Sequence, residues 1–253
     1  MTPEAQLPAA GRLPIASRLW DRALDLLFPP RCAGCGAFGA FLCDPCLAVA
    51  APAGPPRCSV CWAPRDGEGR GDPPEADKLV CYRCRRRRPA FHAARAAFVY
   101  EGPVREAVHA FKFNGLSALA PVMGALMAER LREWSPPVQA VVPVPLSGHR
   151  QRERGYNQSQ LLAREISRQT GLPLAAKALR RARGGVPQVR QPDEEARRAG
   201  VAGAFAPGRP AVSGGILLVD DVITTGATLD ACARVLLHAG AEAVFALTFA
   251  RED

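Results

Sequence analysis

Beyond about residue 95, short apolar runs alternate with longer segments whose apolar residues recur every three or four positions. Short apolar runs are typical of buried strands, and the longer recurrence is typical of amphipathic helices. Alternation of the two predicts an α/β domain with a parallel sheet and helices on both faces. We expect strands over 96–100, 138–144, 216–219 and 243–249, and helices over 104–111, 116–133, 157–170 and 228–238.

The segment before residue 92 has a different pattern, because eight of the nine cysteines form four Cys-x-x-Cys pairs there. Two thiolates separated by two residues can bind one tetrahedral ion, and two such pairs complete a four-cysteine zinc site. Such closed sites leave no open coordination position, so we expect a structural role for one or two Zn²⁺ ions. The pairs are Cys32/Cys35, Cys43/Cys46, Cys58/Cys61 and Cys81/Cys84.

Two arrangements of these pairs are open: sequential pairing, and a cross-braced arrangement. Sequential pairing is favoured because seven residues separate the first two pairs, which suits a hairpin, and because the Gly- and Pro-rich stretch 63–80 can be looped out. Metal is needed because a segment of about 60 residues with few large apolar side chains rarely holds itself together.

The chain of 253 residues therefore divides into an N-terminal tail or helix (1–30), a zinc-binding module (31–92) and the α/β domain (93–253). Charged residues interrupt the first thirty positions, and no apolar run is long enough for a membrane span. We therefore expect a cytoplasmic protein. Cys232 lies apart from the pairs and is expected to be a buried apolar residue.

Basic residues outnumber acidic ones by 33 to 24, and all but three of the 33 are arginine. Arginine suits partners that carry phosphate, although the excess of Ala, Gly, Pro and Arg is also typical of a GC-rich coding bias. The run Arg85–Arg88 directly follows the last cysteine pair. Two interpretations of it are open: contact with single-stranded DNA, and a solvated linker.

The stretch after the apolar run 216–219 carries the most specific chemistry. Asp220 and Asp221 are expected at the carboxyl end of a buried strand, where open α/β sheets bind ligands. Thr224, Thr225 and Gly226 then lead into a helix, and such a loop offers backbone N–H groups and hydroxyls to an anion. Two carboxylates would repel a bare phosphate, whereas they can accept hydrogen bonds from ribose hydroxyls or bind Mg²⁺. The pattern thus predicts a site for a sugar phosphate that carries a metal ion.

A second group of charges follows the expected strand 138–144. Arg150, Arg152 and Arg154 place three guanidinium groups within five residues. This is the charge that a departing pyrophosphate requires, and the alternative is an exposed basic loop.

The segment from Asp220 to Thr228 resembles the motif with which type I phosphoribosyltransferases bind phosphoribosyl pyrophosphate (PRPP), and the whole chain resembles the ComF family (ComFC and GntX proteins). Further shared motifs are Tyr100-Glu101-Gly102-Pro103-Val104, Phe111-Lys112-Phe113, Pro143-Val144-Pro145-Leu146, Arg152-Glu153-Arg154-Gly155-Tyr156-Asn157-Gln158 and Pro187-Gln188.

The resemblance implies a type I phosphoribosyltransferase-like domain behind a double zinc ribbon, with roles for single residues. Asp220 and Asp221 would be the catalytic pair and would bind the ribose hydroxyls, directly or through Mg²⁺. The loop after strand 138–144, with its arginines, would meet the pyrophosphate. The 5′-phosphate would be held by Thr224, Thr225, Gly226, Ala227 and Thr228.

The resemblance also implies an accessory role in DNA uptake and natural transformation, with single-stranded DNA and proteins of the uptake machinery as partners. The alternative is an active enzyme that moves a phosphoribosyl group from PRPP to a nitrogen acceptor, which the sequence does not identify. Residues 180–190 are expected to form a mobile lid over the site. Gly200 departs from the family pattern, which commonly has asparagine there.

Overall fold

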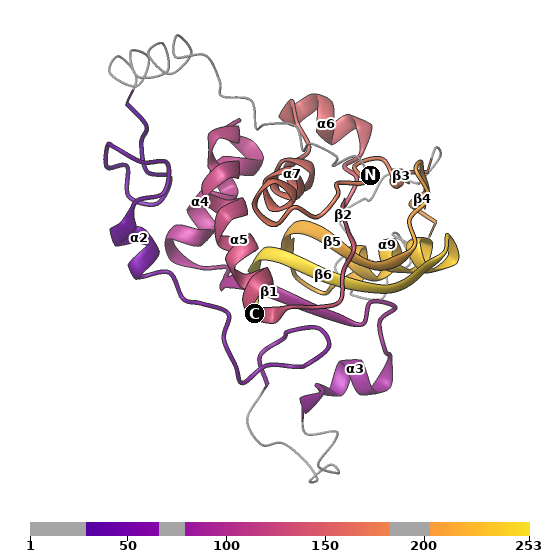
Figure 1. Cartoon of the computed structure of the whole chain (residues 1–253). Helices are drawn as coiled ribbons and strands as arrows, with labels where there is room; N and C mark the ends of the chain where they lie inside the picture. The colour runs from indigo at the N-terminus through magenta and orange to yellow at the C-terminus, as the bar shows by residue number, and fades with distance from the viewer. Residues whose placement is uncertain (1–28, 66–78, 183–202) are drawn as a thin grey trace, which may run out of the picture.

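The computed structural model describes residues 29–65, 79–182 and 203–253, and within them a four-stranded parallel sheet forms the centre (Figure 1). The strand order is β1-β6-β5-β2, so the two strands of highest sequence number lie in the middle. The strands are β1 (Ala93–Val99), β2 (Ala140–Pro143), β5 (Gly214–Ile223) and β6 (Ala241–Arg251).

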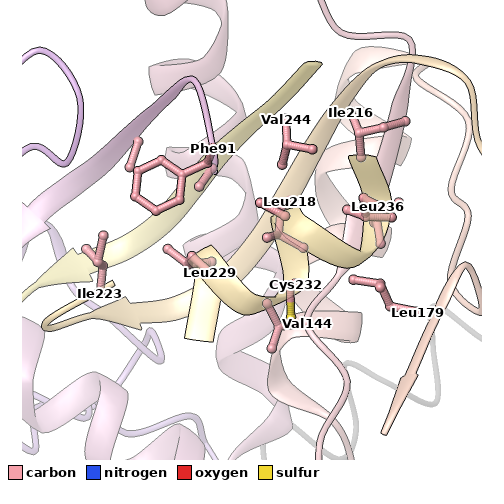
Figure 2. Close-up of a cluster of buried hydrophobic side chains, with 14 of the residues drawn as sticks. Phe91, Val144, Leu179, Ile216, Leu218, Ile223, Leu229, Cys232, Leu236 and Val244 are labelled. Atoms are coloured by element: carbon pink, nitrogen blue, oxygen red, sulfur yellow. The ribbon is translucent and has the colours of Figure 1, made fainter. Parts of the chain in front are cut away.

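Alternate residues of β5 enter two separate hydrophobic cores. Ile216 and Leu218 pack on one face of the sheet with α9 (Ala227–His238), and Figure 2 shows this core. Leu217 and Val219 pack on the opposite face with α4 (Gly102–Phe113), α5 (Ala120–Trp134) and α7 (Gln158–Thr170). A parallel strand that is apolar on both sides needs both faces covered. The predicted class, a parallel α/β sheet with helices on both faces, is confirmed.

The helices follow the predicted segments with small changes at their ends. The segment predicted as one helix over 116–133 is a short 3-10 turn, η2 (Ser117–Leu119), followed by α5, whose first turn contains Pro121. Proline has no N–H to donate, so it suits the first turn of a new helix. Gly171 ends α7 in the left-handed conformation, as its position predicts. Within the described ranges, no helix combines the length and apolarity needed to cross a membrane.

The prediction that β5 ends at Val219 was wrong, because the strand continues through both aspartates to Ile223. The reason is its neighbour β6, which pairs with β5 as far as the match between Ile223 and Arg251. Besides the two short helices of the zinc-binding segment, described below, three elements were not predicted: α6 (Gly148–Arg154), capped by Ser147, and the antiparallel strands β3 (Leu179–Arg181) and β4 (Phe205–Pro207). All three are short and carry little periodic signal.

The cysteine pairs lie on two sides of the sheet (Figure 1). In the first two pairs, Cys43 is the N-cap of α2 (Asp44–Ala48) and Cys46 lies within that helix, and Cys32 and Cys46 join the core on the α4 face. In the last two pairs, Cys81 is the N-cap of α3 (Tyr82–Arg86) and Cys84 lies within that helix, and Cys58 and Cys84 join the core on the α9 face. The zinc-binding segment therefore shares both cores of the α/β domain. The predicted boundaries at 30/31 and 92/93 stay predictions.

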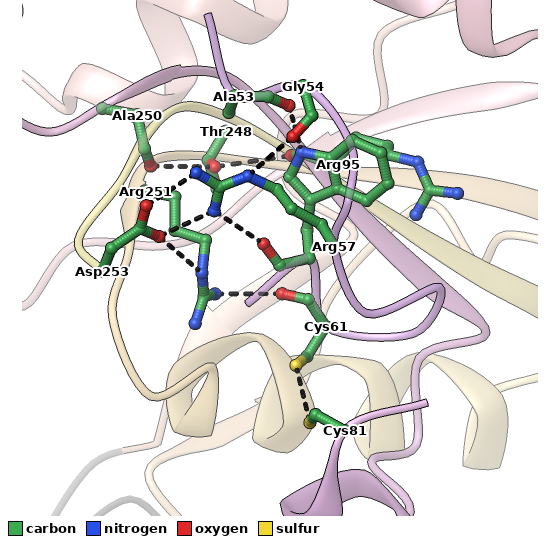
Figure 3. Close-up of polar contacts among 11 residues, drawn as sticks. Ala53, Gly54, Arg57, Cys61, Cys81, Arg95, Thr248, Ala250, Arg251 and Asp253 are labelled. Carbon is green, nitrogen blue, oxygen red and sulfur yellow. Dashed lines mark hydrogen bonds and ion pairs between the residues drawn. The ribbon is translucent and has the colours of Figure 1, made fainter. Parts of the chain in front are cut away.

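Charged side chains at the C-terminus tie the second cysteine group to the sheet (Figure 3). Arg57 donates two hydrogen bonds to the Asp253 carboxylate, at 2.7 and 2.6 Å. Arg251, the last residue of β6, donates from Nη1 to the carbonyl of Cys61 at 2.9 Å. The end of β6 is thus anchored in the zinc-binding segment.

Candidate functional site

The eight paired cysteines form two clusters among the described residues. In each cluster the four sulfur atoms lie within 4.8 Å of one another. The sulfur–sulfur distance is 3.6 Å for Cys32/Cys46 and for Cys35/Cys43, and 3.7 Å for Cys61/Cys81. Zinc–sulfur bonds of about 2.3 Å in a tetrahedron place neighbouring sulfurs about 3.8 Å apart. The clusters therefore fit structural zinc, and the favoured sequential pairing is confirmed.

The acid–base properties of the sulfurs also fit a bound cation. In the second cluster, hydrogen bonds from Cys61 and Cys84 lower the pKa of Cys58, and the bond to Cys58 raises the pKa of Cys61 to about 11. Four thiols this close cannot all ionise unless a positive ion offsets their mutual repulsion. Zinc supplies that charge, and a shell of four thiolates leaves it no open position for catalysis.

Asp220 and Asp221, called the diacid below, meet side chains from two helices. Asp221 is buried, and the Lys112 Nζ at the end of α4 lies 2.8 Å from its Oδ1. Asp220 accepts a hydrogen bond from the Ser159 Oγ at 2.7 Å, in the first turn of α7. Its Oδ1 also accepts the backbone N–H of Asp221 at 3.0 Å. The carboxylates are therefore held in place by α4 and α7.

The pKa of Asp220 is raised to about 7. Burial is the largest cause, and the neighbouring charge of Asp221 adds to it; the hydrogen bond from Ser159 and the charge of Lys112 oppose it. Hydroxyl donors or a divalent cation would lower the pKa of such a carboxyl group, because either one stabilises its ionised form. This is the chemistry that the sequence predicts for the diacid.

The loop that follows β5 leads directly into the 12 residues of α9. Gly226 is the N-cap of this helix and has φ of +77°, which favours glycine. Thr224 is exposed, and the Thr225 Oγ1 accepts the N–H of Ala227 at 3.3 Å. Thr228 lies in the first turn. Because β5 joins the two, the diacid and the threonine loop (Thr224–Thr228) stand together at one edge of the sheet.

Of the three predicted arginines, Arg154 is the one that interacts electrostatically with Asp221. It is partly buried, and within the described part of the chain its Nε has no hydrogen-bond partner. Burial lowers its pKa, and the charge of Asp221 opposes that shift. Arg150 and Arg152 are exposed on α6. The basic segment is thus a helix with one arginine turned toward the site.

Lys112 and Ser159 contact the diacid but were missing from the predicted site residues, as was Arg181. Lys112 was noticed only as part of a family motif, and Ser159 begins an ordinary amphipathic helix. Arg181 lies in β3; burial lowers its pKa, and the charge of Asp220 opposes the shift. Its Nε also has no hydrogen-bond partner among the residues described.

Phe113, the last residue of α4, is an exposed aromatic ring at the rim of the site. It is 59% exposed although Lys112 beside it contacts the diacid. The Arg154 guanidinium lies 4.9 Å from the ring centre, and the His109 ring lies 5.0 Å away. The exposed part of this ring is a surface on which a planar ligand can stack.

Other residues of the shared motifs hold helices together. The Tyr156 hydroxyl and the Gln158 amide both donate to the Phe111 carbonyl, at 2.7 and 3.3 Å. Asn157 donates to the Val144 carbonyl at 3.1 Å. These bonds fix the end of α4 and the end of β2 to α7, so they position Lys112 and α6. Most of the predicted lid (183–190) and Gly200 lie outside the described residues.

Comparison with known proteins gives consistent findings. Residues 23–85 match the family described as the double zinc ribbon domain. The chain is 30% identical to DNA utilization protein YhgH of Salmonella typhi over 193 residues, 74% of this chain and 82% of that protein. It is 30% identical to competence protein F of Haemophilus influenzae over 176 residues, 65% of this chain and 75% of that protein.

Among solved structures, the fold overlaps with a purine phosphoribosyltransferase of Pyrococcus horikoshii. The TM-score is 0.32 and the identity is 20%, over 52% of this chain and 72% of that one.

Proposed function

The chain belongs to the ComF family, with DNA utilization protein YhgH and competence protein F, and on that premise we propose that it binds PRPP with Mg²⁺ and acts as a cytoplasmic accessory factor in DNA uptake or utilisation. One observation carries the proposal: a partly buried pair of carboxylates is continuous with a threonine-rich loop at the start of α9. Eight cysteines kept as metal ligands suit the reducing cytoplasm.

The arrangement suits the parts of a sugar pyrophosphate. The threonine loop and the amino end of α9 would hold the 5′-phosphate, because both present N–H groups and positive partial charge. The diacid would accept the ribose hydroxyls, directly or through Mg²⁺. Arg154 would face the pyrophosphate, with Arg150 and Arg152 nearby. The Arg154 Nε, which has no hydrogen-bond partner among the described residues, supports this role, since a buried donor without a partner is costly unless a ligand completes it.

For DNA, the supporting surface is α3 and the residues that follow it. Arg85, Arg86, Arg87 and Arg88 are all exposed there. Tyr82 is 64% exposed, and the Arg86 guanidinium lies 5.7 Å from its ring. Proteins that bind single strands combine cations for the backbone with aromatic rings on which bases stack. We therefore propose single-stranded DNA as a partner, with proteins of the DNA-uptake machinery as further partners.

An active phosphoribosyltransferase is the second candidate, and the exposed ring of Phe113 favours it. The ring lies beside Lys112 and Arg154, where a planar nitrogen acceptor could stack close to the sugar. Binding at the rim would bring the acceptor toward the anomeric carbon, and Mg²⁺ and the arginines would stabilise the departing pyrophosphate.

Calorimetric titration of the zinc-loaded protein with PRPP and Mg²⁺ tests the ligand site. We expect saturable binding by the wild type and none by Asp220→Asn/Asp221→Asn, because the substitutions remove the charge that holds the metal and sugar. Glu242→Gln is the control, since Glu242 is exposed near the start of β6, at the other end of the strand pair from the diacid. A folded wild type that does not bind would contradict the proposal. Release of pyrophosphate only when a base is added would favour the enzyme.

The DNA proposal predicts a steep dependence of affinity on salt. Replacing Arg85, Arg86, Arg87 and Arg88 by alanine should weaken binding of an oligothymidylate and lower the slope of log K against log salt by about 3, as expected for four phosphate contacts to a single strand. The control with equal charge replaces four exposed arginines on α4, α5 and α7, namely Arg105, Arg132, Arg164 and Arg168. An equal loss in both variants would reject α3 as the contact surface.

A further inference from the structure

The second cysteine cluster touches the threonine loop directly. Arg83 lies in α3 between the ligands Cys81 and Cys84, and its Nη2 donates to the carbonyl oxygen of Thr225 at 3.4 Å. A cavity of about 30 Å³ separates α3 from the start of α9, and its lining includes Cys61, Cys84 and Gly226. This volume holds about one or two water molecules, so the two elements are nearly in contact.

The hydrogen bond from Arg83 sets the orientation of one peptide group in the loop. In a trans peptide the C=O and the following N–H point in opposite directions. Because Arg83 draws the Thr225 carbonyl toward α3, the N–H of Gly226 is directed away from α3. That N–H belongs to the group of loop donors proposed to hold a phosphate.

Two further contacts support the same loop from the zinc-binding segment. A methyl group added at Gly226 would lie 3.7 Å from the Phe91 ring, which packs with Ile223 and Leu229 (Figure 2). The backbone N–H of Ala90 donates to the Asp230 Oδ1 at 2.6 Å, in the first turn of α9. Residues just after the last zinc ligand therefore hold both sides of the loop.

The end of β5 is tied to the same cluster. Arg251 bonds to the Cys61 carbonyl at 2.9 Å, and the next residue, Glu252, donates its N–H to the Ile223 carbonyl at 3.0 Å. Ile223 is the last residue of β5, so the start of the loop is also connected to the cluster. The first cluster has a different neighbour: a methyl group added at Gly34 would lie 2.7 Å from the Pro103 Cβ in α4.

We propose that the second zinc cluster positions the threonine loop, so that zinc binding by this cluster and phosphate binding by the loop strengthen each other, while the first cluster has no such coupling. Arg83 and Phe91 are the positioning residues. The identity of the ligand rests on the proposed function, but the mechanical link does not. Linkage requires reciprocity: if zinc tightens ligand binding by some factor, the ligand tightens zinc binding by the same factor.

Hydrogen exchange of the peptide that covers 222–229 tests the link without any ligand. Arg83→Ala should exchange faster in this peptide than the wild type, with both zinc ions retained. Arg85→Ala is the matched control, because Arg85 lies on the same helix but does not line the cavity. Unchanged exchange in Arg83→Ala would overturn the proposal, whether or not the protein binds PRPP.

Zinc release by a thiol reagent, with PRPP and Mg²⁺ present or absent, tests reciprocity. We expect the ligand to slow release of one of the two ions, and Arg83→Ala to abolish this protection and weaken PRPP binding about fivefold, the lower end of typical couplings. If calorimetry shows binding but release of both ions is unaffected, the coupling is wrong and the proposed function stands. If the wild type does not bind, the proposed function fails, and the exchange experiment alone decides the link.

Discussion

Replacing Cys58 by alanine should remove one zinc ion and most of the stability of the second cysteine cluster. Cys58 has no exposed surface and packs with Val60, Cys84 and Phe91 in the core on the α9 face. Structural zinc contributes on the order of 10 kcal/mol in small zinc modules, which is comparable to the whole free energy of unfolding of an ordinary domain. We therefore expect one zinc ion per chain by elemental analysis and a melting temperature lowered by more than 10 °C.

Cys232→Ala is the matched control. Cys232 is equally buried in the same core, loses the same atom and belongs to neither cluster. Its substitution leaves a small cavity, which should cost about 1 kcal/mol, and both zinc ions should be retained. Equal zinc content in the two alanine variants would show that Cys58 is not a ligand.

The cysteine clusters could be predicted from the sequence because their signal is local. Two cysteines separated by two residues meet through a single turn. The short stretch of sequence between Cys35 and Cys43 favours sequential pairing of the first two pairs, which is the arrangement in the structure. The packing of each cluster could not be predicted, because it depends on contacts such as that of Gly34 with Pro103, far apart in the chain.

The candidate site was predicted only in part, for a similar physical reason. Asp220, Asp221 and the threonine loop are continuous in sequence, so one pattern reveals them. Their partners are not: Lys112 lies at the end of another helix, and Ser159 begins a third. A lone lysine or serine carries no local signal of its target, so such partners are found only when the sheet brings the helices together.

The length of β5 illustrates a further limit. Charged residues after an apolar run usually indicate that a strand has left the core, yet the backbone of Asp220 pairs in register with Thr248. Pairing with a long central neighbour kept the strand in the sheet, and Lys112 and Ser159 made burial of the carboxylates tolerable. The low strand propensity of aspartate is therefore outweighed here by tertiary contacts.

Replacing Lys112 by methionine should destabilise the protein without ligand by about 3 kcal/mol at pH 8. Methionine keeps the length of the side chain, but Asp221, whose side chain is 10% exposed, loses its cation. Removing one partner of a buried ion pair costs about 3 to 5 kcal/mol of stability. The lower value applies here because the Lys112 side chain is 21% exposed. Denaturant unfolding of zinc-loaded protein measures the change.

The loss of stability in Lys112→Met should depend on pH, and the direction of this dependence follows from the pKa of Asp220. Its pKa is about 7 in the folded chain, against about 3.9 when unfolded, so the folded state holds the proton more tightly and this group lowers stability as pH rises from about 4 through 7. Lys112 opposes the increase in pKa. Without it the pKa rises further, so the difference in stability between variant and wild type should be smaller below about pH 6, where Asp220 is protonated in both folded proteins, and largest above about pH 8.

Lys112→Met/Asp221→Asn completes the test, because it removes both charges of the pair. The double variant should recover much of the stability lost by Lys112→Met, since no buried carboxylate at position 221 then lacks a cation. Loss of the same size at every pH, with no recovery in the double variant, would mean that Lys112 acts through the packing of its methylene chain. Recovery would instead show that Lys112 stabilises the ionised carboxylate of Asp221 in the absence of ligand. An ionised diacid of this kind suits a ligand that binds together with Mg²⁺.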